Sequence, residues 1–273
     1  MEIKTDTLKK LEEQVQELED ILNSKTDSIL EHEEDKNLVV QKLRCLGKEL
    51  LTKYEVRVGN ITIEPLRIEP YLFKEKVFED KFIHKEPGIY GPCQRDRFGK
   101  LYIHKGYGGV DIVLSENKNY ALSFLIKNSR ILIGGNIVYP FVKQYRAAEV
   151  LKENGIPTDY DGIALFEKEK HNNSVVFNTV RNGLTKIKER DDFTKEQQAK
   201  YNLLIISSFI ELKEHTSQNY NFEKGYGGDR AVVEYLKDYK TKHPDVSVEE
   251  LDKMRKKLYP NGSRTEFIKE FGN

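Results

Sequence analysis

The segment Ile68-Glu69-Pro70-Tyr71 places a carboxylate among apolar and aromatic neighbours. Such a carboxylate can stabilise positive charge on a reacting carbon, and it can accept a proton from an attacking water molecule. Glu69 is therefore the first candidate catalytic residue. The alternative is a glutamate at a strand end whose side chain points into solvent.

Aromatic and imidazole side chains accompany this carboxylate, with Tyr71 two residues beyond it and both His104 and Tyr107 in the glycine-rich stretch 104–109. Flat rings of this kind can stack on a planar ligand or fill a gap between stacked groups. For each ring the alternative is cross-strand packing within a β-sheet. That alternative is strongest for Tyr102, whose side chain would point opposite to that of Ile103.

Four basic residues fall in one stretch together with aromatic residues: Arg95, Arg97, Lys100 and Lys105. A cluster of this composition suits contact with phosphate groups. The alternative is a solvated charged face, which is the commoner use of a charge run. Arg181 is a weaker candidate for the same role. Lys+Arg and Asp+Glu are both 45 in the 273 residues, so the net charge lends no support to nucleic-acid binding.

Composition excludes several other classes of protein. Hydrophobic residues are 38% and charged residues 33%, which is enough for a core beneath a heavily charged surface. The two cysteines, Cys45 and Cys93, form no CxxC pair, and no His/Cys cluster has metal-ligand spacing, so we expect free thiols and no metal. Phosphate-binding and dinucleotide loops are absent as well, so we expect no cofactor. The charged N-terminus and the lack of a long apolar run predict an intracellular, cytoplasmic protein without a membrane span.

Residues 5–53 are expected to be helical, with a second helix from about residue 34. Leu8, Leu11, Val15, Leu18 and Leu22 are spaced three and four residues apart, which makes an apolar seam of about two and a half heptads. Three uses of this helix are open: packing on its own domain, self-association, or docking of a different partner.

Strand patterns fill the middle of the chain. They lie at 54–58 and 61–63, at 101–103, 110–114 and 120–126, at 131–133 and 137–139, and at 162–167, 175–177 and 203–212. Helices are expected at 141–154, 231–239 and 248–258. This order predicts an α+β fold with flanking helices. We expect an N-terminal helical extension (1–35), an α+β domain (36–240) and a C-terminal helical tail (241–273).

The order of motifs between residues 40 and 236 resembles that of the alkyladenine (3-methyladenine) DNA glycosylases. A helix carrying Leu46, Leu50 and Leu51 precedes a hairpin, and a strand with Glu69 and Tyr71 follows. The resemblance continues through His84, the stretch 99–109, the strands 110–114 and 121–127, and, weakly, the segment 180–184. It implies the mixed or antiparallel curved sheet of that family, with an extra helix at the N-terminus.

The resemblance also implies roles for single residues. Glu69 matches the glutamate that activates water, and His84 matches a histidine that helps to hold it. Tyr71 matches a tyrosine of the base pocket, and His104 replaces another stacking tyrosine. Tyr107 matches the residue that wedges into the duplex, and Lys127 stands where the family carries an arginine.

The pocket asparagine of the family has no clear counterpart, and Asp111 is a candidate replacement. Gly106, Gly108 and Gly109 would leave this wall of the pocket small, which favours a bulky modified base. A lyase acting through a Schiff base would need a nucleophilic lysine in the pocket. Lys85 and Lys127 are conceivable, but nothing in the sequence singles out either one, so we expect simple hydrolysis that leaves an abasic site.

These features together predict a monofunctional DNA glycosylase that flips a modified base out of double-stranded DNA. Its role would be base-excision repair or defence against phage DNA with modified, sugar-decorated bases. Two alternatives stay open. The chain could be a nucleic-acid-binding module without catalysis, or an interaction protein that works through residues 5–30.

Overall fold

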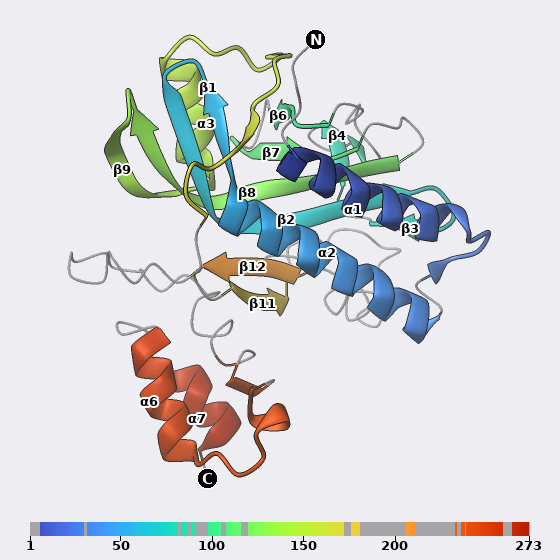
Figure 1. Cartoon of the computed structure of the whole chain (residues 1–273), viewed down its shortest axis with the longest axis vertical. Helices are drawn as coiled ribbons and strands as arrows, with labels where there is room; N and C mark the ends of the chain where they lie inside the picture. The colour runs from blue at the N-terminus through green and yellow to red at the C-terminus, as the bar shows by residue number, and fades with distance from the viewer. Residues whose placement is uncertain are drawn as a thin grey trace.

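The computed structural model describes residues 6–29, 32–80, 83–86, 89–90, 98–104, 108–115, 120–171, 176–180, 206–210, 233, 236–237, 239–258 and 264–272. Within them the chain folds as a curled antiparallel sheet with helices packed against it (Figure 1). The α+β class and the curved antiparallel sheet predicted from the sequence are both confirmed.

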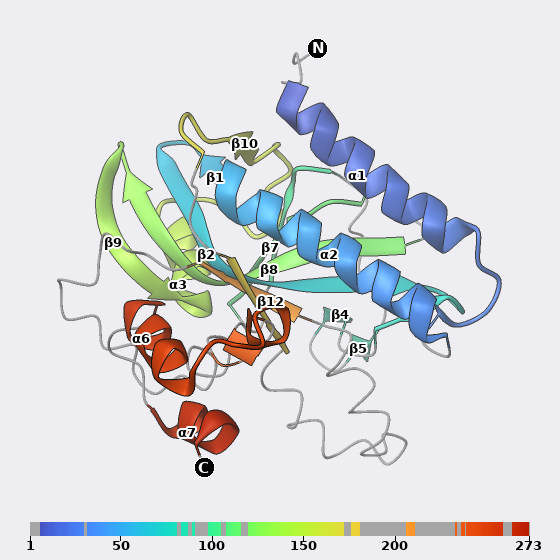
Figure 2. The same ribbon diagram turned by 60° about the horizontal axis from the view of Figure 1, so that its bottom comes forward.

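Two N-terminal helices lie side by side across the sheet, α1 (Asp6–Asn23) and α2 (Glu33–Lys53), as Figure 2 shows. The apolar seam of α1 is buried, with Leu11, Val15, Leu18 and Leu22 each at most 5% exposed. These leucines and this valine belong to the same hydrophobic core as the sheet. The seam is therefore used for packing within the chain, which is the first of the three uses considered above.

Two long strands form the spine of the sheet, β2 (Ile61–Lys74) and β8 (Tyr120–Ile133), and they pair along their whole length. Beyond β8 follow β7 (Val110–Val113) and β6 (Leu101–Ile103), while β9 (Asn136–Lys143) pairs with the far half of β8. The other edge of β2 pairs in turn with β1 (Tyr54–Val58), β12 (Ile206–Ile210) and β3 (Phe78–Glu79). The remaining strands are β10 (Leu165–Glu167) on β1, β11 (Val176–Val180) on β12, and a separate pair, β4 (His84–Glu86) and β5 (Ile89–Tyr90).

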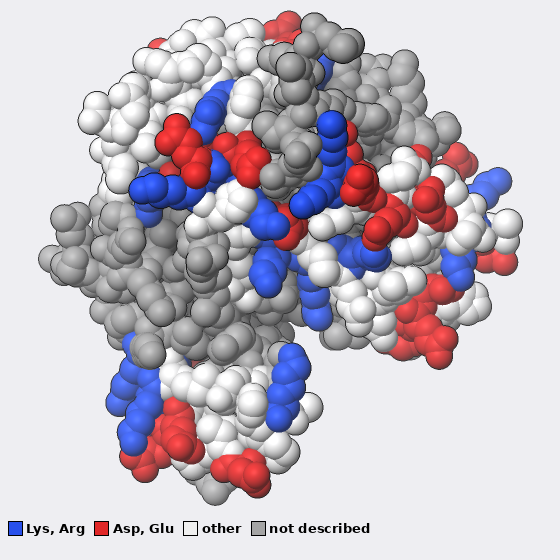
Figure 3. All heavy atoms as spheres, in the orientation of Figure 1, with Lys and Arg blue, Asp and Glu red and all other residues white. Residues whose placement is uncertain are grey.

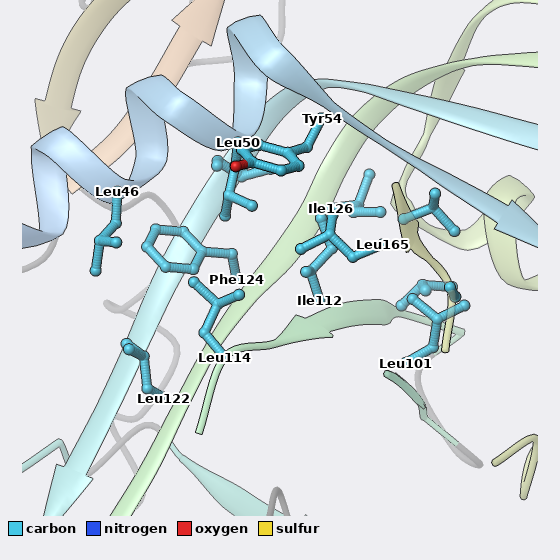
Figure 4. Close-up of a cluster of buried hydrophobic side chains, with 14 of the residues drawn as sticks. Leu46, Leu50, Tyr54, Leu101, Ile112, Leu114, Leu122, Phe124, Ile126 and Leu165 are labelled. Carbon is cyan, nitrogen blue, oxygen red and sulfur yellow. The ribbon is translucent and has the colours of Figure 1, made fainter. Parts of the chain in front are cut away.

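Alternating residues of the spine build the core on one face of the sheet. Leu122, Phe124 and Ile126 point toward Leu46 and Leu50 of α2 (Figure 4). All five side chains are at most 1% exposed. Because side chains alternate along a strand, the residues between them, such as Ser123 and Leu125, point to the opposite face.

Three expectations about single elements need correction. The strands expected at 120–126 and 131–133 are one continuous strand, because β-bulges absorb the break in alternation between them. The helix expected at 141–154 begins only at Gln144, since β9 runs on through Lys143, and α3 spans Gln144–Glu153. The strand expected at 162–167 begins only at Leu165, the first residue of β10. In the segment 203–212, the described residues 206–210 form β12.

The described C-terminal residues are helical and have a small core of their own. They include the helices α6 (Val248–Leu258) and α7 (Thr265–Phe271). Val233, Leu236, Leu251 and Phe267 form a hydrophobic cluster distinct from the main core. None of the helices among the described residues has the length and apolar character needed to cross a membrane.

Candidate active site on the outer face of the sheet

The candidate catalytic residues lie on the sheet face opposite to α2. Glu69 in the middle of β2 is paired with Leu125 of β8, and Leu125 is paired with Asp111 of β7. Directly paired residues of antiparallel strands point to the same face, so the three side chains form a row across the sheet. Ile68 and Ile112, their neighbours along β2 and β7, belong to the core on the other face.

The Glu69 carboxylate is buried and held at one of its two oxygens. Its side chain is 1% exposed, so the alternative of a glutamate that points into solvent is wrong. The Tyr71 hydroxyl donates to Oε2 at 3.3 Å, and Nζ of Lys127 lies 3.4 Å from the same oxygen. No described residue donates a hydrogen bond to Oε1, although this atom is buried.

A β-bulge sets the position of Lys127. Arg67 of β2 is paired with Asn128, but the next residue, Ile68, is paired with Ile126, so Lys127 has no partner across the ladder. An extra residue of this kind is re-aimed relative to a regular strand. The Lys127 side chain is 26% exposed, so it contacts both the buried carboxylate and solvent.

A second buried carboxylate, that of Asp111, holds the imidazole of His104. Asp111 is fully buried; its Oδ2 accepts from the Ser123 hydroxyl at 2.9 Å, and its Oδ1 lies 2.9 Å from Nε2 of His104. The ring of Tyr102 meets the His104 ring edge to face at 4.7 Å between centroids. Asp111 is the candidate replacement for the pocket asparagine, and both of its oxygens are engaged within the protein, where it orients His104.

Gly108 and Gly109 do not leave the space that the sequence suggested, and Gly106 lies outside the described residues. A Cβ atom on Gly109 would lie 2.9 Å from Cδ1 of Leu125, 3.1 Å from Cδ2 of His104 and 3.2 Å from Nε2 of Gln144. A Cβ atom on Gly108 would lie 3.1 Å from Cδ1 of Tyr145. These glycines therefore allow close packing of α3 against the site, and they do not make room for a bulky ligand.

For the remaining predicted site residues, the described structure shows no contact with Glu69. Tyr107, Lys105, Arg95, Arg97 and Arg181 lie outside the described residues. His84 is in β4, where its backbone pairs with Tyr90, and its side chain is outside the description. Lys100 is engaged by Asp161, with 2.6 Å between Nζ and Oδ1.

Charge on the visible surface is mixed. On the face drawn in Figure 3, the described lysines and arginines are interspersed with acidic side chains. Among the described residues, no group of three or more His, Cys, Asp or Glu side chains is placed to hold a metal ion. The described charges that meet near the site are those of Glu69, Lys127, Asp111 and, if protonated, His104.

Ser123, Gln144 and Tyr145 are site residues that the sequence did not predict. Ser123 had a detectable signal, because it alternates with Leu122 and Phe124 and so shares a face with Leu125 and Lys127. Gln144 and Tyr145 begin α3, far from Gly108 and Gly109 in sequence, and only the fold brings them together. A comparison of the chain with protein-family models, with curated proteins and with solved structures found no match.

Proposed function

We propose that this protein is a DNA glycosylase of the alkyladenine type, in which Glu69 activates the water that hydrolyses the N-glycosidic bond of a flipped, modified base. The observation that carries the proposal is the state of the Glu69 carboxylate. A buried oxygen without a hydrogen bond costs about 1–3 kcal/mol, and such atoms in native proteins call for a functional explanation. Oε1 is such an atom among the described residues, which leaves it available to accept from a water molecule or a substrate group.

The geometry suits the chemistry of this bond. Departure of the base leaves positive charge on the sugar, which a nearby carboxylate stabilises electrostatically. Tyr71 and Lys127 fix Oε2, so Oε1 is the oxygen that accepts a proton from water. The site needs no cofactor for this reaction, and the product is an abasic site.

The neighbouring rings suit the extruded base. His104, oriented by Asp111 and Ser123, and Tyr71 belong to the same outer face as Glu69. Bases stack on aromatic and imidazole rings, and their edges accept and donate hydrogen bonds. The partner would be double-stranded DNA inside the cell, in base-excision repair or in defence against phage.

The class of base is decided by a direct comparison of substrates. The packing at Gly108 and Gly109 removes the support that these two glycines gave to a bulky base. Phage DNA with sugar-decorated pyrimidines should be tested beside DNA with alkylated purines. Release of alkylpurines alone would end the bulky-base hypothesis.

Glu69→Gln tests the chemistry against simple binding. The amide has the size of the carboxylate but cannot accept the proton, and general-base catalysis contributes about 10²–10⁴ in rate. We expect single-turnover base release to fall by that factor while affinity for the same DNA survives. A non-catalytic binding protein would show no release before or after the substitution.

A further inference from the structure

Hydrolysis of the N-glycosidic bond does not by itself require a lysine at the position of Lys127. Its ammonium group is 3.4 Å from a buried carboxylate, and the bulge at Ile68 and Asn128 turns it out of the ladder. A charge partner for Glu69 could equally be supplied by an arginine. A lysine adds the chemistry of a primary amine, and this one is also partly open to solvent.

The product of the proposed hydrolysis is a reaction partner for that amine. An abasic deoxyribose opens to an aldehyde at C1′, which lies where the scissile bond was. A neutral lysine amine attacks an aldehyde, and a carboxylate beside it can take up the proton that the ammonium must lose. Glu69 is placed to do this for Lys127.

We propose that Lys127 forms a Schiff base with the abasic sugar and gives the protein a second activity, cleavage of the DNA strand at abasic sites. This inference rests on the proposed function, because it assumes that the sugar reaches Glu69. In the first step the ammonium and the aldehyde give a protonated imine and one molecule of water. In the second step a base removes a proton from C2′, a C2′–C3′ double bond forms, and the 3′ phosphate leaves with the electrons of the C3′–O bond. Water then hydrolyses the imine and regenerates Lys127.

Borohydride reduction traps the imine, so the experiment uses the full-length protein, sodium borohydride and duplex DNA with an abasic site made in advance by removal of uracil. Lys127→Arg keeps a positive charge beside Glu69 but cannot form an imine. Lys143→Arg is the matched control, because Lys143 is an exposed lysine on the neighbouring strand β9, where it is paired with Asn128.

We expect the wild type and Lys143→Arg to give equal amounts of covalent protein–DNA adduct, and Lys127→Arg to give at least tenfold less. Peptide mass spectrometry should place the reduced adduct on Lys127. An equal adduct in Lys127→Arg, or none in the wild type, overturns the inference. Circular dichroism shows whether the Lys127→Arg protein is folded. If it is not, the position of the adduct mapped in the wild type decides whether Lys127 forms the imine.

The two proposals fail in different ways. If the wild type releases a modified base but forms no adduct with abasic DNA, the proposed lyase role of Lys127 is wrong and the proposed glycosylase function is supported. If the wild type forms the adduct on Lys127 but releases no base from any modified DNA, the proposed glycosylase function is wrong and the proposed imine chemistry of Lys127 is supported.

Discussion

Nζ of Lys127 lies 3.4 Å from Oε2 of Glu69, on the sheet face that the core does not use. The two residues come from strands that are adjacent in the sheet, although they are 58 residues apart in the sequence. It neutralises a carboxylate that would be costly to bury alone. The second oxygen of that carboxylate accepts no hydrogen bond from a described residue.

The Ser123 hydroxyl should stabilise the fold through Asp111. Ser123→Ala removes the donor to a buried carboxylate oxygen, and we expect it to lower the free energy of unfolding by about 1–3 kcal/mol. Ser129→Ala is the control, since Ser129 lies on the same strand at 1% exposure and its hydroxyl has no hydrogen-bond partner among the described residues. Urea denaturation measures both. Equal losses for the two variants would contradict a specific role for the Ser123 bond.

Because the apolar seam of α1 is buried within the chain, a substitution in this seam should lower stability and leave the oligomeric state unchanged. Leu18 is fully buried in the main core, so Leu18→Ala should cost about 2–5 kcal/mol. Its mass in solution, measured by light scattering, should equal that of the wild type. A lower mass with unchanged stability would instead favour self-association through this helix.

Lys168 should make stability depend on pH at the alkaline end. Burial lowers the pKa of its amine, which donates to the carbonyl of Leu51 at 3.0 Å. Because the folded state binds this proton more weakly than the unfolded state, the unfolded chain holds more protons between the two pKa values. Stability from this group therefore rises as the pH rises through the folded pKa toward the unfolded one.

Lys168→Met removes that titration. Urea denaturation across the alkaline range gives the free energy of unfolding of both proteins. As the pH increases, this free energy should rise for the wild type relative to Lys168→Met. A difference that is constant with pH would show that Lys168 has an ordinary pKa in the folded protein.

Local patterns in the sequence predicted much of the fold. The strand pattern at 120–126 predicted a strand, and the structure has one there, with Leu122, Phe124 and Ile126 in the core. The spacing of Leu11, Val15 and Leu18 predicted an apolar seam on α1, and the structure buries it against the sheet. The length of β8 could not be predicted, because a bulge interrupts the alternation without ending the strand.

The site was predicted in part. Glu69 and Tyr71 are close in sequence, and their hydrogen bond follows from their places two residues apart on one strand. The partners of Asp111 depended on strand register, which no local pattern fixes, so its role in orienting His104 was missed. Lys127 was a candidate site residue and lies beside Glu69, but the bulge that directs it there was not visible in the sequence.

The central claim is that the Glu69 carboxylate drives release of a base from DNA. Mass spectrometry of the small molecules released from a panel of modified DNAs, incubated with the wild type or with Glu69→Gln, tests it most directly. The account predicts that a free modified base appears with the wild type and is reduced by at least about a hundredfold with Glu69→Gln. Equal release by the two proteins, or no release by the wild type from any DNA in the panel, would contradict it.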